Sequence, residues 1–159
     1  YDAQGRLRTE HRRIQVKIPR GITAGKRIRL SGQGAPGRHG GVPGDLYLEV
    51  QLKPHPLFRV EGADVHLTLP IAPWEAALGA KVKTPTLAGD VEVTVPAGAR
   101  SEQKLRLKGR GLGPAGKKPG DQIVALQIVL PPADNETQQA FYRDMAVRMP
   151  FDPRASLIS

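Results

Sequence analysis

A glycine-rich hexapeptide is the first stretch of this sequence whose residue types and spacing could do chemistry. Gly32-Gln33-Gly34-Ala35-Pro36-Gly37 matches the G-x-G-x-x-G string with which a loop holds the phosphates of a dinucleotide. Such a site needs a helix directly after the loop, because the helix N-terminus faces the pyrophosphate. The glycines and prolines that come next, Gly40, Gly41 and Pro43, cannot build that helix. We therefore reject a nucleotide site and expect these glycines to serve turns with positive φ.

No other residues have the spacing of a catalytic or metal centre. The four histidines are His11, His39, His55 and His66. None of them has a second histidine or a carboxylate at a metal-ligand spacing. The chain contains no cysteine, which excludes disulfides and Cys-ligated zinc, and no serine lies in a nucleophile elbow. The sequence thus predicts no catalytic residue, no cofactor and no metal site, and favours a binding protein over an enzyme.

Three segments of the first half of the chain recur in the second half. The first copies are Val16-Lys17-Ile18-Pro19-Arg20-Gly21, Arg29-Leu30-Ser31-Gly32-Gln33-Gly34 and Pro43-Gly44-Asp45, and the second copies are residues 93–98, 106–111 and 119–121. The first two pairs keep an offset of 77 residues, and the third pair has an offset of 76. Such self-similarity indicates two copies of one structural unit.

Alternation of apolar and polar residues predicts the strands of both copies. The strands expected in the first copy are residues 12–18, 27–30 and 46–52, and those in the second are 91–95 and 105–107. The closing strand of the second copy, at 122–130, is a more continuously apolar run. Ahead of the second copy we expect a strand at 65–69, a short helix with Pro73 near its start and Gly79 just past its end, and a strand at 81–84. The fold class is therefore mainly β with short helices.

The first copy has a shorter N-terminal flank than the second. Only 15 residues precede Val16, whereas about 30 residues of strand and helix precede Val93 in the second unit. We expect the opening strand and helix of the first unit to be missing, which would leave its sheet with an unpaired edge. The first residue is Tyr1 and not Met, which also indicates a fragment or a processed chain.

The C-terminal region has the pattern of one amphipathic helix. Asp134 or Asn135 can cap a helix that runs to about Arg148 and stops before Pro150. Its apolar stripe consists of Phe141, Tyr142, Met145 and Met149. This stripe either packs on its own domain or binds a partner, for example in a dimer.

The net charge of +9 is concentrated in the first third of the chain. Residues 1–60 contain 12 Lys and Arg against four Asp and Glu. This basic region is either a solvated surface or a site that attracts phosphate backbones, with Arg6, Arg8, Arg12 and Arg13 as candidate DNA contacts. The seven aromatic residues are mostly isolated and do not form a stacking platform for single strands, so phosphate contact is the expected mode of DNA binding.

Phe58 is a large apolar residue just after the strand that closes the first copy. It either fills a core between domains or lines a groove in which an extended peptide adds a strand to a sheet edge. The candidate peptide-binding residues are Phe58 and, on the strand expected at 12–18, Ile14 and Val16.

Five segments carry a resemblance to a known family through their order and spacing. They are Val16-Lys17-Ile18-Pro19-Arg20-Gly21, residues 26–34, Gly44-Asp45-Leu46, His55-Pro56-Leu57-Phe58 and Pro73-Trp74-Glu75-Ala76-Ala77-Leu78-Gly79-Ala80. With them, nearly the whole chain resembles the C-terminal substrate-binding region of the DnaJ family of co-chaperones. The last of these segments and Phe151-Asp152-Pro153-Arg154 look most like the bacterial curved-DNA-binding members of that family.

The resemblance implies two tandem β-sandwich-like domains, at residues 1–60 (truncated) and 61–131, and a C-terminal helix and dimerisation tail at 132–159. It implies a homodimer that binds unfolded polypeptide for a DnaK-type chaperone and binds DNA without sequence specificity, with a preference for curved DNA. It places the protein in the cytoplasm, on the nucleoid. The alternative is a nucleoid DNA-binding module with little client binding.

The chain departs from the family pattern in two respects. The J domain of the family contacts DnaK through His-Pro-Asp, but the only His-Pro here continues as His55-Pro56-Leu57, so we expect that function to be absent from this chain. The zinc-binding Cys repeats of some members are also missing. The resemblance assigns Phe58 to the family's peptide groove, which we expect to be incomplete without the opening strands. No run of about 18 apolar residues predicts a membrane span, and no signal peptide is recognised.

Overall fold

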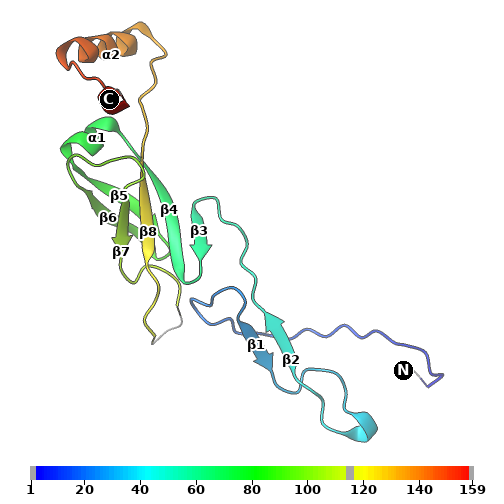
Figure 1. Ribbon diagram of the computed structural model, residues 1–159. Coiled ribbons are helices and arrows are strands. Elements are labelled where there is room, and N and C mark those ends of the chain that lie inside the picture. Colours follow the sequence, from blue (N-terminus) through cyan, green and yellow to red (C-terminus); the bar gives the residue numbers. More distant parts are fainter. Residues whose placement is uncertain (1–2, 114–116, 158–159) are drawn as a thin grey trace. The chain divides into compact units, whose positions relative to one another are not determined.

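The computed structural model describes residues 3–113 and 117–157, and its secondary structure is mostly β (Figure 1). The strands are β1 (Arg27–Leu30), β2 (Leu46–Glu49), β3 (Phe58–Glu61), β4 (Asp64–Ile71), β5 (Ala80–Thr86), β6 (Gly89–Val95), β7 (Lys104–Leu107) and β8 (Gln122–Ile128). The helices are α1 (Pro73–Leu78) and α2 (Glu136–Arg148), with short 3-10 turns η1 (Arg38–Gly40) and η2 (Ala155–Leu157). The expectation of a mainly β chain with a C-terminal helix is confirmed.

Strands β1 and β2 form the antiparallel hairpin of the first copy. Ile28 faces Leu48 and Leu30 faces Leu46, so the four half-buried apolar side chains share one face of a two-stranded sheet. The strand expected at 46–52 ends at Glu49, opposite Arg27, because the partner strand begins there. No described residue before Val65 is buried, so this part of the chain has little core of its own.

The strand expected at residues 12–18 is wrong. These residues alternate in sequence as a strand does, but they belong to no strand of the structure. Ile18 is 66% exposed, and the Arg12 guanidinium donates to the carbonyl of Gln33 across 3.1 Å. A strand requires a hydrogen-bonded neighbour, and none of the sheets of the described residues includes this segment.

The second copy contributes to a four-stranded sheet with the order β3-β4-β8-β7, and β5 pairs with β6 in a separate sheet. Alternate residues of β4 are buried, namely Val65, Leu67, Leu69 and Ile71. Strand β8 is buried almost continuously from Gln122 to Val124 and again at Leu126, as its apolar run predicted, although it ends at Ile128 and not at residue 130. Strand β3 was not predicted. A loop connects β7 to β8, and its residues 114–116 lie outside the described part of the chain.

The chain divides into two compact units. One contains the described parts of residues 1–67, 86–88 and 106–123, and the other contains those of 68–85, 89–105 and 124–159. Strands β4, β5, β7 and β8 each contribute residues to both units. The division into three regions at residues 60 and 131 stays a prediction.

Both helices begin and end where the sequence signals predicted. In α1, Pro73 occupies the first turn, and Glu75 accepts a hydrogen bond from the Ala72 N–H at 2.8 Å. Gly79 ends α1 with φ at 78°, and a Cβ there would lie 3.0 Å from the Ala97 nitrogen, so glycine is required twice over. Asn135 is the N-cap of α2, where its side chain accepts from the Gln138 N–H at 2.9 Å.

Helix α2 differs from a core helix, since none of its residues is buried. The Tyr142 hydroxyl donates to the carbonyl of Pro131, which ties the helix to the segment that precedes it. Met149 is the C-cap and not a member of the helix. Among the described residues, no helix has the length and apolar content that crossing a bilayer requires.

Candidate functional sites

Phe58 lines an apolar cavity of about 600 Å³. Phe58 and Val60 reach it from β3, and Leu52 and Pro54 reach it from the segment after β2. Leu87, which belongs to the same compact unit, completes the apolar lining. The cavity can therefore take one apolar side chain of a bound ligand by removing it from water.

His55 fixes the turn that presents Phe58. Its Nδ1 accepts hydrogen bonds from the backbone N–H groups of Leu57 at 3.0 Å and Phe58 at 3.4 Å. Accepting at Nδ1 leaves the ring proton of neutral histidine on Nε2. The two rings also contact each other, with centroids 5.0 Å apart. His55 is thus a structural residue of the cavity.

Strand β3 is an edge strand beside this cavity. In the four-stranded sheet its one neighbour is β4, with Phe58 opposite Leu67 and Val60 opposite Val65. An edge strand offers unpaired N–H and C=O groups to an added strand. An open backbone edge and an apolar cavity therefore lie together around Phe58.

The structure does not bring the other two candidate peptide-binding residues to this cavity. Ile14 and Val16 are absent from its described lining, and Ile14 is partly exposed on the segment before β1. Val60 and Leu87 line the cavity but were not predicted from the sequence. The sequence signal for Val60 is its position two residues after Phe58, which places both on one face of a strand.

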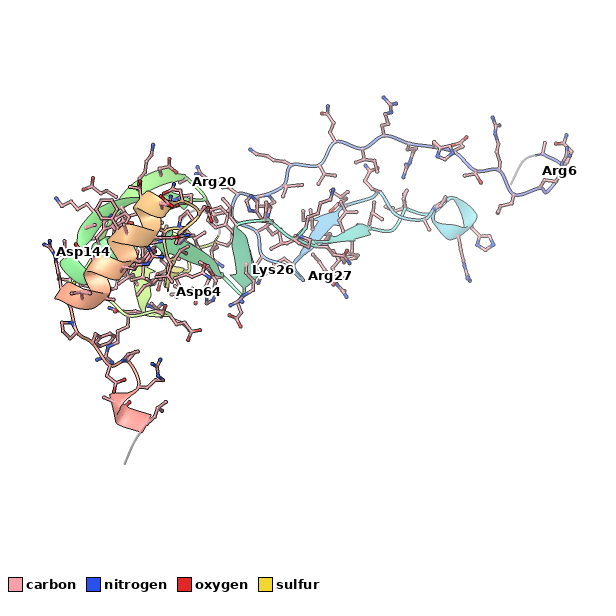
Figure 2. All side chains as sticks on the ribbon, turned by 90° about the horizontal axis from the view of Figure 1, so that it is seen from above. Arg6, Arg20, Lys26, Arg27, Asp64 and Asp144 are labelled. Carbon is pink, nitrogen blue, oxygen red and sulfur yellow. The ribbon has the colours of Figure 1, made fainter. Side chains whose placement is uncertain are left out.

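The four candidate DNA contacts lie on the N-terminal segment ahead of β1. Arg6, Arg8, Arg12 and Arg13 are all exposed, and the Arg12 guanidinium also donates to the carbonyl of Gln33. Figure 2 shows Arg6 near the far end of this segment, well separated from Arg20. The cations are thus spread along an extended backbone and do not form one compact patch.

A second apolar cavity, of about 350 Å³, lies between α2 and the segment that precedes it. Three of the four candidate dimerisation residues line it, namely Phe141, Tyr142 and Met145, together with Trp74 and Leu130. Phe141 is 72% exposed and Trp74 is 60% exposed, which leaves large apolar surfaces in water. Met149, at the helix end, is not part of the described lining.

In each copy of the repeat, one aspartate accepts hydrogen bonds from an arginine side chain and from a backbone N–H of the loop between the strands. We call this pair of hydrogen bonds the clasp of the loop. Asp45 accepts from Arg29 Nε at 2.6 Å and from the Gly32 N–H at 3.1 Å. The hydrogen bond from the Gly32 N–H, and after it that from Arg29, holds the pKa of Asp45 below its ordinary value.

The second copy repeats this geometry. Asp121 accepts from Arg106 Nη1 at 2.6 Å and from the Gly109 N–H at 2.9 Å. The Gly109 N–H and then Arg106 lower the pKa of Asp121 in the same way. The repeated Arg, Gly and Asp are visible in the sequence, but this interaction between them was not predicted.

Comparison with known proteins decides the family. The family model described as "DnaJ C terminal domain" matches residues 3–131. The chain belongs to the DnaJ C-terminal domain family. The resemblance drawn from the five sequence segments is confirmed.

Curated relatives of this DnaJ C-terminal chain carry the name "Curved DNA-binding protein". The protein of that name from Coxiella burnetii (strain RSA 493 / Nine Mile phase I) is 54% identical over 154 residues, which cover 97% of this chain and 49% of the relative. That from Serratia proteamaculans (strain 568) is 46% identical over 157 residues, which cover 97% of this chain and 50% of the relative. The chain thus spans about half the length of the curated relatives it matches.

Proposed function

We propose that this chain is the client-binding part of a DnaJ-type co-chaperone and that it also binds DNA without sequence specificity. The observation that carries the first function is the cavity at Phe58 beside the edge strand β3. The name shared by the relatives and the basic first third of the chain support the second.

Client binding combines backbone pairing with the burial of one side chain. An extended segment of an unfolded protein pairs with the open edge of β3 and places an apolar side chain against Phe58. Burial of one such side chain contributes roughly 1.5–3 kcal/mol, so a single contact is weak. Weak contacts suit a protein that must release its clients, and a dimer raises the overall affinity through avidity.

The dimer would form through the exposed apolar surface of α2 and Trp74. Two copies that cover this surface together remove Phe141 and Met145 from water, which stabilises the pair. Delivery of the client to a DnaK-type chaperone requires a J domain with its His-Pro-Asp, and this sequence contains no such tripeptide. The proposed location is the cytoplasm, on the nucleoid, where both clients and DNA are present.

DNA binding would proceed through the exposed arginines of the N-terminal segment. Each phosphate contact releases condensed counterions, so the logarithm of affinity falls with the logarithm of salt concentration by about 0.9 per contact. Four contacts from Arg6, Arg8, Arg12 and Arg13 predict a slope of roughly −3 to −4. A slope near zero in a filter-binding or anisotropy titration contradicts this function.

An aggregation assay tests client binding. We expect Phe58→Ala to lower the affinity for an unfolded client by roughly 10- to 150-fold, because the lost burial is worth roughly 1.5–3 kcal/mol. Light scattering of an aggregating client, in the presence of the whole chain, measures the loss of protection. Leu78→Ala is the matched control, since Leu78 is an exposed apolar residue of α1 outside the cavity.

Phe58 is half-buried, so its truncation also affects folding. Leu87→Ser removes a second, exposed residue of the same cavity with less effect on stability. If both variants keep their circular dichroism spectra and protect the client as well as the wild type, the cavity is not the client site.

A further inference from the structure

A third cavity, of about 510 Å³, is lined by cations that neither proposed site includes. It lies within one compact unit, where the turn at Arg20 and Gly21 meets the glycine-rich loop at residues 109–113. The charged residues of its described lining are Arg20, Arg110 and Lys117, and this lining contains no carboxylate.

Two glycines allow the backbones to approach closely enough to form this cavity. Gly21 has a φ of 74°, and a Cβ at this position would lie 1.8 Å from the carbonyl oxygen of Gly113. A Cβ at Gly111 would lie 2.4 Å from the carbonyl oxygen of Ala63. Arg20 and Arg110 directly precede these two glycines. The close backbone contacts therefore fix the backbone positions from which both arginine side chains extend.

Hydrogen bonds hold the glycine-rich loop in place. The Gly111 N–H donates to the Gly120 carbonyl at 2.9 Å, and the Leu112 N–H donates to the Ala63 carbonyl at 2.7 Å. The base of the cavity is thus preformed, which reduces the ordering cost of binding a ligand.

The cations are peculiar to this cavity and do not belong to the repeated scaffold. In the other copy of the repeat, Ala97 corresponds to Arg20 and Gln33 corresponds to Arg110. Gly41 takes the place of Lys117 at the offset of 76 residues. The glycines that shape both loops are repeated, but the three charges are not, so loop closure does not require them.

The three cations have no ion-pair partner among the described residues. The carboxylate of Asp121, close by in the sequence, already accepts hydrogen bonds from Arg106 and from the Gly109 N–H. Like charges around one cavity repel one another, and an anion placed among them relieves this repulsion. Arginine in particular binds the paired oxygens of a phosphate through two parallel hydrogen bonds.

We propose that Arg20, Arg110 and Lys117 form a phosphate-binding site for the DNA backbone, separate from the arginines of the N-terminal segment. This inference rests on the proposed DNA-binding function and adds a second set of contacts to it. The glycines of the lining let a backbone phosphate approach the loop closely, and they offer few side chains to grip a peptide. Phosphate contacts of this kind position DNA without reading its sequence.

Salt-dependent binding of a DNA duplex to the whole chain tests the site. We expect the triple variant Arg20→Gln, Arg110→Gln, Lys117→Gln to have a slope of log affinity against log salt that is shallower by about 2.7, at about 0.9 per lost contact. A charge-matched control is Lys83→Gln, Lys104→Gln, Arg143→Gln, whose residues line none of the three cavities. We expect this control to stay within about one unit of the wild-type slope.

The outcomes separate the inference from the function on which it rests. A wild-type chain without salt-dependent DNA binding overturns both. Wild-type binding with a site triple whose slope equals that of the wild type, or of the control, overturns the phosphate site and leaves DNA binding through other residues standing. All the substituted residues are exposed, so the variants should fold, which circular dichroism verifies.

Two further measurements address the chemistry of the ligand. Arg20→Lys with Arg110→Lys retains both charges, and we expect it to keep the wild-type slope. Polyglutamate, as a carboxylate polymer, should displace DNA much less effectively than a phosphate polymer of equal charge. Equal competition through Arg20, Arg110 and Lys117 would show a general site for acidic chains and would overturn the assignment to DNA phosphates.

Discussion

In the first copy of the repeat, Asp45 clasps Arg29 and the Gly32 N–H, and in the second copy Asp121 clasps Arg106 and the Gly109 N–H. The lengths of the corresponding hydrogen bonds agree closely, although the two loops share few other residues. The repeated Arg-Leu-x-Gly-x-Gly and Pro-Gly-Asp segments therefore encode one interaction, which closes a long loop between two antiparallel strands.

The surroundings of the two clasps differ much more than the clasps themselves. No described residue before Val65 is buried, whereas β8, which begins directly after Asp121, is buried from Gln122 to Val124. The Asp121 N–H also donates to Asp64 at 2.8 Å, 57 residues away along the chain. The repeated segments thus specify how the loop closes. The core consists of residues of β4 and β8, and the repeated segments do not determine whether those residues are buried.

The largest difference between the copies should appear when one strand leucine that faces inward is truncated in each. Leu126→Ala, at a side chain only 1% exposed, should lower the free energy of unfolding by about 2–5 kcal/mol. Leu48→Ala, at a half-buried position of β2, should cost less than about 2 kcal/mol because much of that side chain already contacts water. Urea denaturation measures both losses, and equal losses would contradict the contrast in burial.

The sequence predicted those elements whose signals are local. The alternation at residues 27–30 predicted β1, Pro73 and Gly79 marked the ends of α1, and Asp134 or Asn135 marked the start of α2, where Asn135 is the N-cap. Each signal lies within the element or next to it, so no knowledge of the rest of the fold was needed.

The sequence failed where the deciding partner is distant along the chain. Residues 12–18 alternate as well as β1 does, yet a strand exists only if another strand pairs with it. Strand β3 is the opposite case, since its apolar and polar residues alternate over only four positions and it forms by pairing with β4. Phe58 was found from its size and position, but its cavity needs Leu87, which no local pattern connects to it.

A second contrast concerns the segments that come directly after the closing strand of each copy. After β2 the chain passes through Pro54 into the cavity at Phe58, and after β8 it passes through Pro131 into the cavity at Phe141. We propose that the first cavity takes a client and the second takes another copy of the chain. Single substitutions should therefore separate the two functions.

Phe141→Asp should convert the dimer to a monomer, because a carboxylate in the covered apolar surface is costly to desolvate. Analytical ultracentrifugation at micromolar concentration measures this change. The affinity of each chain for a short, monovalent client peptide should stay within about twofold of the wild type, since only avidity is lost. Phe58→Ala should show the reverse, with the dimer intact and peptide affinity reduced.

Val147→Asp is the matched control for the dimer, because Val147 is an exposed residue of α2 that does not line the cavity. It should remain a dimer. A wild-type chain that sediments as a monomer would contradict the proposed dimer. A control that dissociates as fully as Phe141→Asp would contradict dimerisation through the cavity at Phe141.

The smallest effect is expected from the clasps, and it depends on pH. Both aspartates have a lowered pKa in the folded chain, so each stabilises the fold fully at a pH above its ordinary value of 3.8. This stabilisation is lost as the pH falls through the lower, folded pKa, because the carboxylate then takes up a proton and its charge-assisted bonds weaken. Asp45→Asn and Asp121→Asn should each lower the urea midpoint at pH 7.

We expect the larger shift from Asp121→Asn, since that clasp adjoins the buried strand β8 and the hydrogen bond to Asp64. Repeating the urea titrations from about pH 7 down to about pH 2 compares both variants with the wild type. The differences in midpoint should shrink steadily below about pH 4, where the wild-type carboxylates also become neutral. A difference that persists unchanged at the acid end would mean that the clasps act through shape and not through charge, and the equivalence of the two copies would then rest on their glycines alone.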